Sequence, residues 1–292
     1  LRADPKAQLI GFWDSDEDRA GTFAQQTGVP FIGFRDDLLA AVDAVIVCSE
    51  NTGHAELIEA AANQGKAILC EKPIGVSESD FATITAAAEQ VPVMTAFPCR
   101  FSPAYAELKA KVEAGAIGAI QAISATNRGR CPFGWFVEKE KSGGAAMIDH
   151  TVHVADLLLD LLHEEPAEVA AFTGNNMYGN DWEDTAVVSM RYPSGIPVTL
   201  DSSWSRPAHY KTWGDVTMRV VGENGVLELD MFGQSIQHYG PKGHQEVGIV
   251  PDLDAAMVDE FLSAVIEERT PLVTAAHGIA AARVALRGYA SL

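Results

Sequence analysis

Over the first third of the chain, short apolar runs alternate with segments of helical periodicity. Residues 44–48 and 67–70 are continuous apolar runs, and each is followed by a helical pattern. Strands that are apolar along their whole length are typical of parallel sheets, because crossover helices cover both faces of such sheets. The alternation therefore predicts a doubly wound, Rossmann-type α/β domain over residues 1–100.

The same patterns predict the individual elements of this domain. Glycine, proline and capping residues mark where the runs begin and end. Ser77, for example, is the expected N-cap of the helix that follows it. We expect strands over residues 7–13, 44–48, 67–70 and 92–96, and helices over residues 16–28, 54–62 and 78–89.

From residue 101 onward, strand-like segments dominate. Alternating patterns separated by turn sequences at residues 192–195 and 222–225 are typical of antiparallel hairpins. Residues 101–292 are therefore predicted to form an α+β domain for substrate binding and oligomerisation, with a large, mostly antiparallel sheet. We expect its strands at residues 119–126, 186–191, 198–202 and 216–221, and its helices at residues 103–113, 146–162 and 255–268.

Composition excludes several classes of function. The chain has 21 Lys and Arg against 40 Asp and Glu, and its net charge of −19 repels nucleic acid and anionic membranes. No apolar run approaches the roughly 20 residues of a membrane helix. The four cysteines have no metal-ligand spacing and no C-x-x-C pair. We therefore expect a cytoplasmic protein that binds no nucleic acid, membrane or metal.

Asp14 is the first candidate for cofactor binding. It follows the expected strand 7–13, where an acidic side chain of a dinucleotide fold binds the adenosine ribose, although it could equally cap the next helix. The glycine fingerprint of that fold stands about 20 residues before the acid, which places it upstream of Leu1. We expect the natural protein to have upstream residues with a strand and a glycine loop, and this sequence to be a truncated version.

Lys72 is the first candidate for catalysis. The segment Cys70-Glu71-Lys72-Pro73 lies at the carboxyl end of a strand, the edge where open α/β sheets bind their ligands. A lysine there can polarise a substrate oxygen, and Pro73 can lock the turn, for which a cis bond is one way. The alternative is a solvated loop lysine before a helix-starting proline.

Asp149 and His153 are four residues apart on the expected helix 146–162, which two glycines precede. They share one helix face, whereas His150 lies about 100° away from Asp149. A carboxylate beside an imidazole can orient it as a general base, although the pair could also be structural. A metal site made of His150, His153 and Asp156 is a weaker alternative, because these positions do not converge on one point.

Taken together, these motifs resemble those of the Gfo/Idh/MocA oxidoreductases, in order and spacing along nearly the whole chain. The resemblance implies hydride transfer between a nicotinamide cofactor and a hydroxyl-bearing carbon of a sugar, cyclitol or related polyol. It also implies a role for each matching residue. The matching stretches are Ser49-Glu50-Asn51-Thr52-Gly53-His54, Cys70-Glu71-Lys72-Pro73, Gly143-Gly144 with Asp149 and His153, Arg100-Phe101-Ser102-Pro103, Gly115-Ala116-Ile117-Gly118 and Glu183-Asp184-Thr185-Ala186.

By this resemblance His153 accepts the proton, Asp149 orients it or shares that role, and Lys72 polarises the reacting oxygen. Ser49, Asn51 and His54 are implied to line the cofactor cleft, and Glu71 to lie near the nicotinamide ribose. NAD is expected rather than NADP, because Asp14 would repel a 2′-phosphate and only Arg19 nearby could receive one.

The remaining expectations concern substrate and partners. Arg128 and Trp135 would lie at the rim of the second domain, where Trp135 could stack on a sugar, although surface charge and core packing explain them as well. One face of the large sheet is expected to form a homodimer or homotetramer. Two other functions stay open, an NAD-dependent glycosidase of the same superfamily and a non-catalytic sensor of a sugar or nucleotide.

Overall fold

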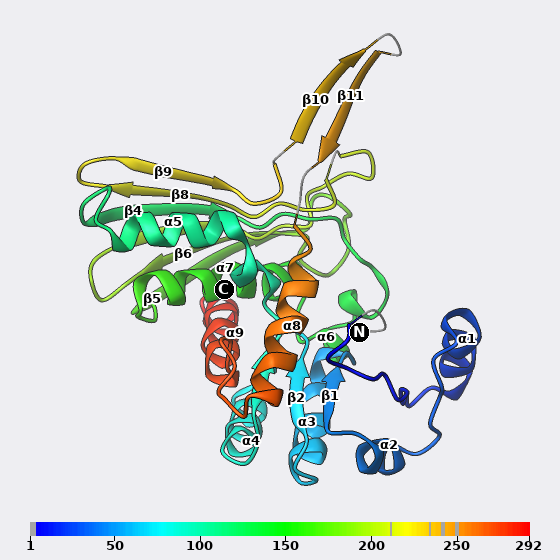
Figure 1. Ribbon diagram of the computed structural model, residues 1–292. Helices are drawn as coiled ribbons and strands as arrows, with labels where there is room; N and C mark the ends of the chain where they lie inside the picture. Colours follow the sequence, from blue (N-terminus) through cyan, green and yellow to red (C-terminus); the bar gives the residue numbers. More distant parts are fainter. Residues whose placement is uncertain (1–3, 211, 234, 241–242, 249–250) are drawn as a thin grey trace.

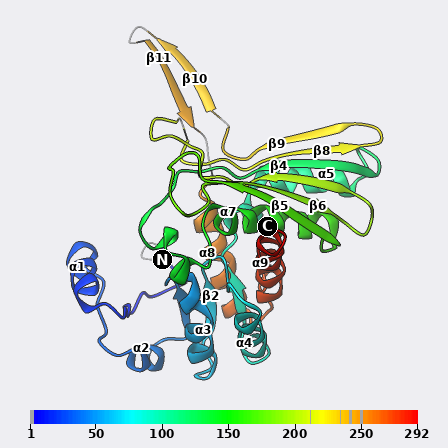
Figure 2. The same cartoon turned by 180° about the vertical axis from the view of Figure 1, so that it is seen from behind.

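The structure is a computed structural model, and it describes residues 4–210, 212–233, 235–240, 243–248 and 251–292. Two sheets lie at an angle to each other with helices packed between and around them, and a separate hairpin projects from one side (Figures 1 and 2). The two units adjoin near the middle of the molecule. The fold is therefore the expected combination of an α/β unit and an α+β unit.

The first sheet is parallel, with the order β1 (Ala44–Val47), β2 (Ala67–Cys70) and β3 (Val93–Thr95). Every residue of β2 is buried, as its apolar run predicts. The crossover helices α3 (His54–Ala62) and α4 (Glu78–Ala88) connect the strands, and Ser77 caps α4 as predicted. Because the strands are parallel, the segments after β1 and β2 emerge at the same edge of the sheet.

The prediction of a strand over residues 7–13 is wrong. A strand needs a hydrogen-bonded neighbour, and within the described chain this segment pairs only through an isolated bridge between Phe12 and Phe31. The helices α1 (Glu17–Thr27) and α2 (Arg35–Ala41) on either side of residue 31 lie away from the three strands (Figure 1).

The second sheet has six strands in the order β5-β6-β7-β4-β8-β9. Only β4 and β7 pair in parallel among its described neighbours, and the other pairs are antiparallel, as predicted for a mostly antiparallel sheet. The long helices α5 (Pro103–Glu113) and α7 (Ala146–Leu162) lie along the sheet (Figure 1). Its strands are β4 (Ile120–Thr126), β5 (Glu168–Gly174), β6 (Thr185–Arg191), β7 (Pro197–Asp201), β8 (Thr217–Gly222) and β9 (Val226–Asp230).

One face of this sheet is buried and the other is open. Val188, Leu200 and Met218 point into the core, whereas Phe172 and its cross-strand partner Val187 are exposed on the opposite face. The two-residue alternation seen in the sequence therefore separates a helix-covered face from an uncovered one that exposes Phe172 and Val187.

The strands β10 (Ser235–Gly240) and β11 (Gly243–Gly248) form a two-stranded hairpin that belongs to neither of these sheets. They pair with each other in antiparallel register and project away from the body of the molecule (Figure 1). The sequence patterns did not predict it.

The C-terminal segment joins the two units. The helices α8 (Leu253–Ile266) and α9 (Ala275–Ala290) follow the hairpin, and α9 packs against both α7 and α4. Between them the chain adds to the edge of the first sheet, where the Thr95 amide donates to the Val273 carbonyl at 3.0 Å. Ile279 and Ala282 of α9 are part of the core beneath the first sheet. The first unit is thus completed by residues from the end of the chain.

A buried ion pair makes a further link. Arg100, in the 3₁₀ turn η2 (Pro98–Phe101) after β3, donates two hydrogen bonds to the Asp156 carboxylate of α7, at 2.7 and 3.0 Å. Both side chains are almost completely buried, and Asp160 pairs with the same guanidinium at 2.9 Å. Because an unpaired buried charge is strongly destabilising, this pair fixes α7 relative to the first sheet.

Candidate active site

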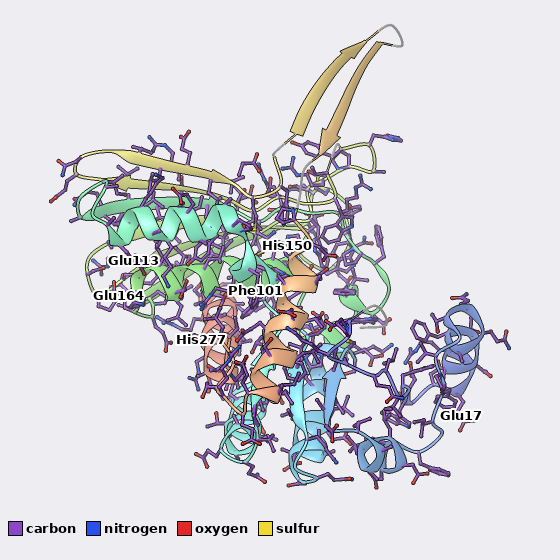
Figure 3. The ribbon with its side chains drawn as sticks, viewed as in Figure 1. Glu17, Phe101, Glu113, His150, Glu164 and His277 are labelled. Carbon is purple, nitrogen blue, oxygen red and sulfur yellow. The ribbon has the colours of Figure 1, made fainter. Side chains whose placement is uncertain are left out.

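The candidate active site lies where the carboxyl ends of β1 and β2 face the first half of α7. Lys72 follows β2, while Asp149, His150 and His153 lie on α7. Figure 3 shows His150 near the centre of the molecule, between the six-stranded sheet and the first unit. Of the residues predicted from sequence, this arrangement brings Lys72, Asp149 and His153 together.

Lys72 and Asp149 form a direct ion pair. The Lys72 ammonium donates to Asp149 Oδ1 at 2.5 Å and to the Asp149 carbonyl at 3.1 Å. Both side chains are largely buried. The peptide bond between Lys72 and Pro73 is cis, as the sequence suggested. The alternative of a solvated loop lysine is therefore excluded.

The second oxygen of Asp149 is also occupied. Trp204 Nε1 donates to Oδ2 at 2.9 Å, and His150 Nε2 lies 3.3 Å from the same oxygen. Burial alone would raise the pKa of Asp149, but Lys72, His150 and the Trp204 N–H outweigh it and hold that pKa below its usual range. Asp149 is therefore a carboxylate at neutral pH.

His153 does not pair with Asp149 as the helix spacing suggested. Among the described residues no hydrogen bond joins the two, because the Asp149 carboxylate is directed at Lys72 and Trp204. His153 Nδ1 is buried without a partner, and its ring lies edge-on to Phe97 with centroids 6.0 Å apart. Burial, reinforced by the nearby Lys72 ammonium, lowers the pKa of His153 well below 6.5. The imidazole is therefore neutral and able to accept a proton.

His150, rather than His153, is the imidazole beside the carboxylate. Its Nδ1 lies 2.9 Å from the Asn127 carbonyl, so this nitrogen carries a proton, and its Nε2 faces Asp149. The helical wheel places residues 149 and 150 about 100° apart, but the side chains reach around the helix to meet. Sequence reasoning therefore missed His150 and Trp204 as neighbours of Asp149.

The start of α7 is fixed by side chains from distant elements. Glu183 accepts hydrogen bonds from the Ala145 amide at 2.9 Å and from the Tyr289 hydroxyl at 2.5 Å. A carboxylate at a helix N-terminus is favourable, because the unpaired amides there carry partial positive charge. Gly143 has φ +78, and a Cβ on it would lie 2.6 Å from Val76. The glycine pair thus permits close packing at the point where α7 enters the site.

The residues predicted to line the cofactor cleft divide into two groups. His54 and Asn51 are buried, and both bind backbone carbonyl groups. The ring nitrogens of His54 lie 2.9 Å from the Pro73 carbonyl and 3.1 Å from the Ser49 carbonyl. Asn51 donates to the Ser142 carbonyl at 2.8 Å. His54 therefore does not line an open cleft, because both ring nitrogens are used within the fold. It ties the turn after β2 to the loop after β1.

Ser49 and Glu71 remain at the edge of the sheet. Ser49 is partly exposed and donates to the Glu50 carbonyl at 3.1 Å. Glu71 is partly exposed and accepts from the Lys72 amide at 3.2 Å. Burial raises the pKa of Glu71, while Lys72 works in the opposite direction. Both side chains are placed to meet a ligand at the carboxyl ends of β1 and β2.

Asp14 borders a surface cavity of about 440 Å³, which Trp13, Phe34 and Arg35 also line. Its carboxylate accepts from Arg19 at 2.6 and 2.8 Å and from the Asp16 amide at 2.8 Å. The Arg19 guanidinium lowers the pKa of Asp14. Asp16, not Asp14, provides the N-cap of α1, so the capping alternative for Asp14 is wrong.

The two residues predicted at the substrate rim have partners of their own. Arg128 donates to Asp215 at 2.7 and 3.0 Å, and Trp135 stacks on Phe136 with ring centroids 3.9 Å apart. A different tryptophan, Trp213, is 58% exposed, and its ring and that of His150 both lie against Gly129. The sequence could not predict that Trp213 lies near His150, because a single tryptophan in a loop has no pattern that shows its neighbours.

The described ranges contain no group of three or more His, Cys, Asp or Glu side chains arranged to hold a metal ion. A search of the helices in the same ranges finds none with the length and hydrophobicity needed to cross a bilayer.

Comparisons with known proteins match both units. A family model described as an oxidoreductase family with an NAD-binding Rossmann fold matches residues 1–97, and the GFO/IDH/MocA C-terminal domain matches residues 105–228. A myo-inositol 2-dehydrogenase of Thermotoga maritima is 32% identical, covering 77% of this chain and 68% of that protein.

A further relative and a solved structure also match most of the chain. A 1,5-anhydro-D-fructose reductase of Ensifer adhaerens is 28% identical, covering 81% of this chain and 71% of that protein. The crystal structure of a probable dehydrogenase from Thermotoga maritima superposes with a TM-score of 0.84 at 27% identity, covering 100% of this chain and 91% of that chain.

The close packing before α7 yields a stability prediction. Gly143→Ala adds a methyl against Val76 and also places a side chain at positive φ, whereas Gly115→Ala, at φ +73 with open space around it, meets only the backbone strain. We expect Gly115→Ala to lower the free energy of unfolding by about 1 kcal/mol, and Gly143→Ala to lower it by roughly 1 to 3 kcal/mol more. Urea unfolding of both variants measures the difference. Equal losses would mean that the contact with Val76 does not matter.

Proposed function

The chain belongs to the Gfo/Idh/MocA oxidoreductase family, and on this premise we propose that it transfers a hydride between NAD and a hydroxyl-bearing carbon of a sugar or cyclitol. The first unit is an NAD-binding Rossmann-type domain, so the protein is an NAD-binding oxidoreductase. The observation that carries the reaction type is the buried Lys72–Asp149 pair beside the neutral imidazole of His153. The relatives named for inositol and anhydrofructose support the substrate class.

Lys72 and His153 have complementary tasks in this proposal. When a CH–OH group is oxidised, its carbon loses a hydride and its oxygen loses a proton. The Lys72 ammonium stabilises negative charge on that oxygen, and neutral His153 accepts the proton. Asp149 holds the ammonium in place through its 2.5 Å contact. NAD supplies the hydride acceptor when it is bound.

Two regions fit the cofactor. Asp14 is ionised beside the 440 Å³ cavity, where it can accept hydrogen bonds from ribose hydroxyls and disfavours a 2′-phosphate. Ser49 and Glu71 lie at the carboxyl ends of β1 and β2, close to Lys72. We assign Asp14 to the adenosine end and Ser49 and Glu71 to the nicotinamide end. Arg19 already pairs with Asp14, which leaves it less available to a phosphate.

The substrate class is tested by a spectrophotometric screen of the protein, including any upstream residues, with NAD or NADP and a panel of inositols, sugars and other polyols. We expect NADH formation with at least one cyclitol or sugar and a higher kcat/KM with NAD than with NADP. Release of free sugar from glycosides would instead favour an NAD-dependent glycosidase. Ligand binding without turnover across the whole panel would favour a sensor.

His153→Ala is expected to lower kcat by roughly 10²-fold or more, because it removes the proton acceptor. His209→Ala, which truncates an exposed histidine, is the matched control and is expected to leave kcat unchanged. Affinity for NAD is expected to stay nearly constant in both variants. A His153→Ala enzyme with near-normal kcat would rule out this role.

The pH profile of the wild-type enzyme tests the same assignment. Since burial lowers the pKa of His153 well below 6.5, the imidazole stays neutral as the pH falls through 6.5. The kcat/KM for oxidation is therefore expected to stay level down to pH 6.5 and to decline only below it.

The open sheet face supports a homo-oligomer. Phe172 is 73% exposed and pairs across the strands with the exposed Val187, so two apolar side chains lie side by side on the outward face. We propose that a second copy of the chain covers it, and we place the protein in the cytoplasm, which its four free cysteines support.

Phe172→Glu is expected to shift the protein towards monomer in analytical ultracentrifugation, because it buries a charge in this interface. Phe34→Glu, at a similarly exposed phenylalanine (75%) that lies off the sheet, is the matched control. Dissociation by both variants, or by neither, would contradict the assignment of the interface to this face.

A further inference from the structure

Trp204 makes a contact that the proposed reaction does not yet use. It lies in the segment after β7, and its indole N–H donates to Asp149 Oδ2 at 2.9 Å. The side chain is fully buried, with 0% of its surface exposed. A buried indole N–H needs an acceptor, and here the acceptor is the carboxylate that holds Lys72.

The indole is held rigidly. The Trp204 amide donates to the Asp184 carbonyl at 2.7 Å, and the ring packs edge-to-face on Trp182 with centroids 5.7 Å apart. Ala145 and Ala146, at the start of α7, belong to the same apolar cluster. Trp204 therefore presents its N–H at a fixed point relative to the helix that carries Asp149.

We propose that Trp204 is a positioning residue for the reaction: it fixes the rotation of the Asp149 carboxylate, so that Oδ1 faces Lys72 and the ammonium is held at the reacting oxygen. The proposal rests on the proposed function, in which Lys72 polarises the substrate.

The geometry explains why Asp149 needs a second anchor. Oδ1 is held by Lys72, and without Trp204 the other oxygen would have only His150, 3.3 Å away. The carboxylate could then rotate and leave Lys72, because the unprotonated Nε2 of neutral His150 cannot donate to it. A neutral donor on Oδ2 prevents this rotation without adding charge to the site.

The charges around Asp149 determine how loss of the indole N–H is detected. Lys72 and His150 favour its ionised form, whereas burial and the neighbouring carboxylate of Glu71 disfavour it. Without the Trp204 N–H this balance moves towards the protonated form, so the pKa of Asp149 rises. The titratable groups that face Asp149 are Glu71 and Lys72 after β2, Cys131 after β4, and His150 and His153 on α7.

The test replaces the N–H and keeps the shape. Incorporation of 3-benzothienylalanine at position 204 exchanges the indole N–H for sulfur, and Trp204→Phe is the genetically simple counterpart. We expect kcat to fall by roughly 10-fold to 100-fold, as for loss of a hydrogen bond to a charged group, with unchanged affinity for NAD. The pKa of the Asp149 carboxyl, followed by NMR titration, should rise. Phe81→Leu, which alters a fully buried aromatic ring on α4 away from the site, is the control and should change neither kcat nor the affinity for NAD.

A crystal structure of the benzothienylalanine protein gives a readout independent of turnover. The proposal expects the Asp149 carboxylate to rotate and its contact with Lys72 to lengthen. An unchanged contact would overturn it, as would an unchanged kcat with an unchanged pKa of Asp149, while the proposed function would still stand. Absence of turnover by the wild-type protein on every substrate would count against the proposed function, and the rotation of Asp149 would then decide the role of Trp204.

Discussion

The ion pair between Lys72 and Asp149 is the interaction on which the site depends. It joins a residue at the end of β2 to a residue in the first turn of α7, and both partners are largely buried. Each charge would be strongly destabilising there without the other, so the pair is stable only while the first sheet and α7 keep their separation. The arrangement of the two units is therefore a requirement of the site and not only a matter of packing.

Three other features meet that requirement from different directions. Arg100 and Asp156 form a second buried ion pair between the end of the first sheet and the middle of α7. Glu183 accepts hydrogen bonds at the start of α7 and from Tyr289 of the last helix. The same last helix completes the core beneath the first sheet. The position of Asp149 is thus determined by contacts spread over the whole chain.

This spread explains what the sequence could predict. The doubly wound and α+β units and most helices and strands followed from local periodicity, and α3 and α7 begin and end where predicted. The family followed from the resemblance of the ordered motifs. Residues 7–13 are not a strand, because pairing depends on a neighbour that a local pattern does not contain. Motif positions identified Lys72, Asp149 and His153, but helical spacing suggested the wrong imidazole for Asp149. Trp204 carried no signal, since its contact with Asp149 arises only from the tertiary structure.

Burial at the junction acts in opposite directions on the groups of the site. It penalises the charge of Asp149, and the lysine, His150 and the indole N–H must compensate for it. The same burial, together with the Lys72 ammonium, lowers the pKa of His153 and keeps its imidazole neutral at neutral pH. A more open junction would relieve Asp149 but would let His153 hold its proton more tightly. Burial at the junction therefore keeps His153 neutral, and the contacts of Lys72 and Trp204 with Asp149 offset the cost of burying that carboxylate.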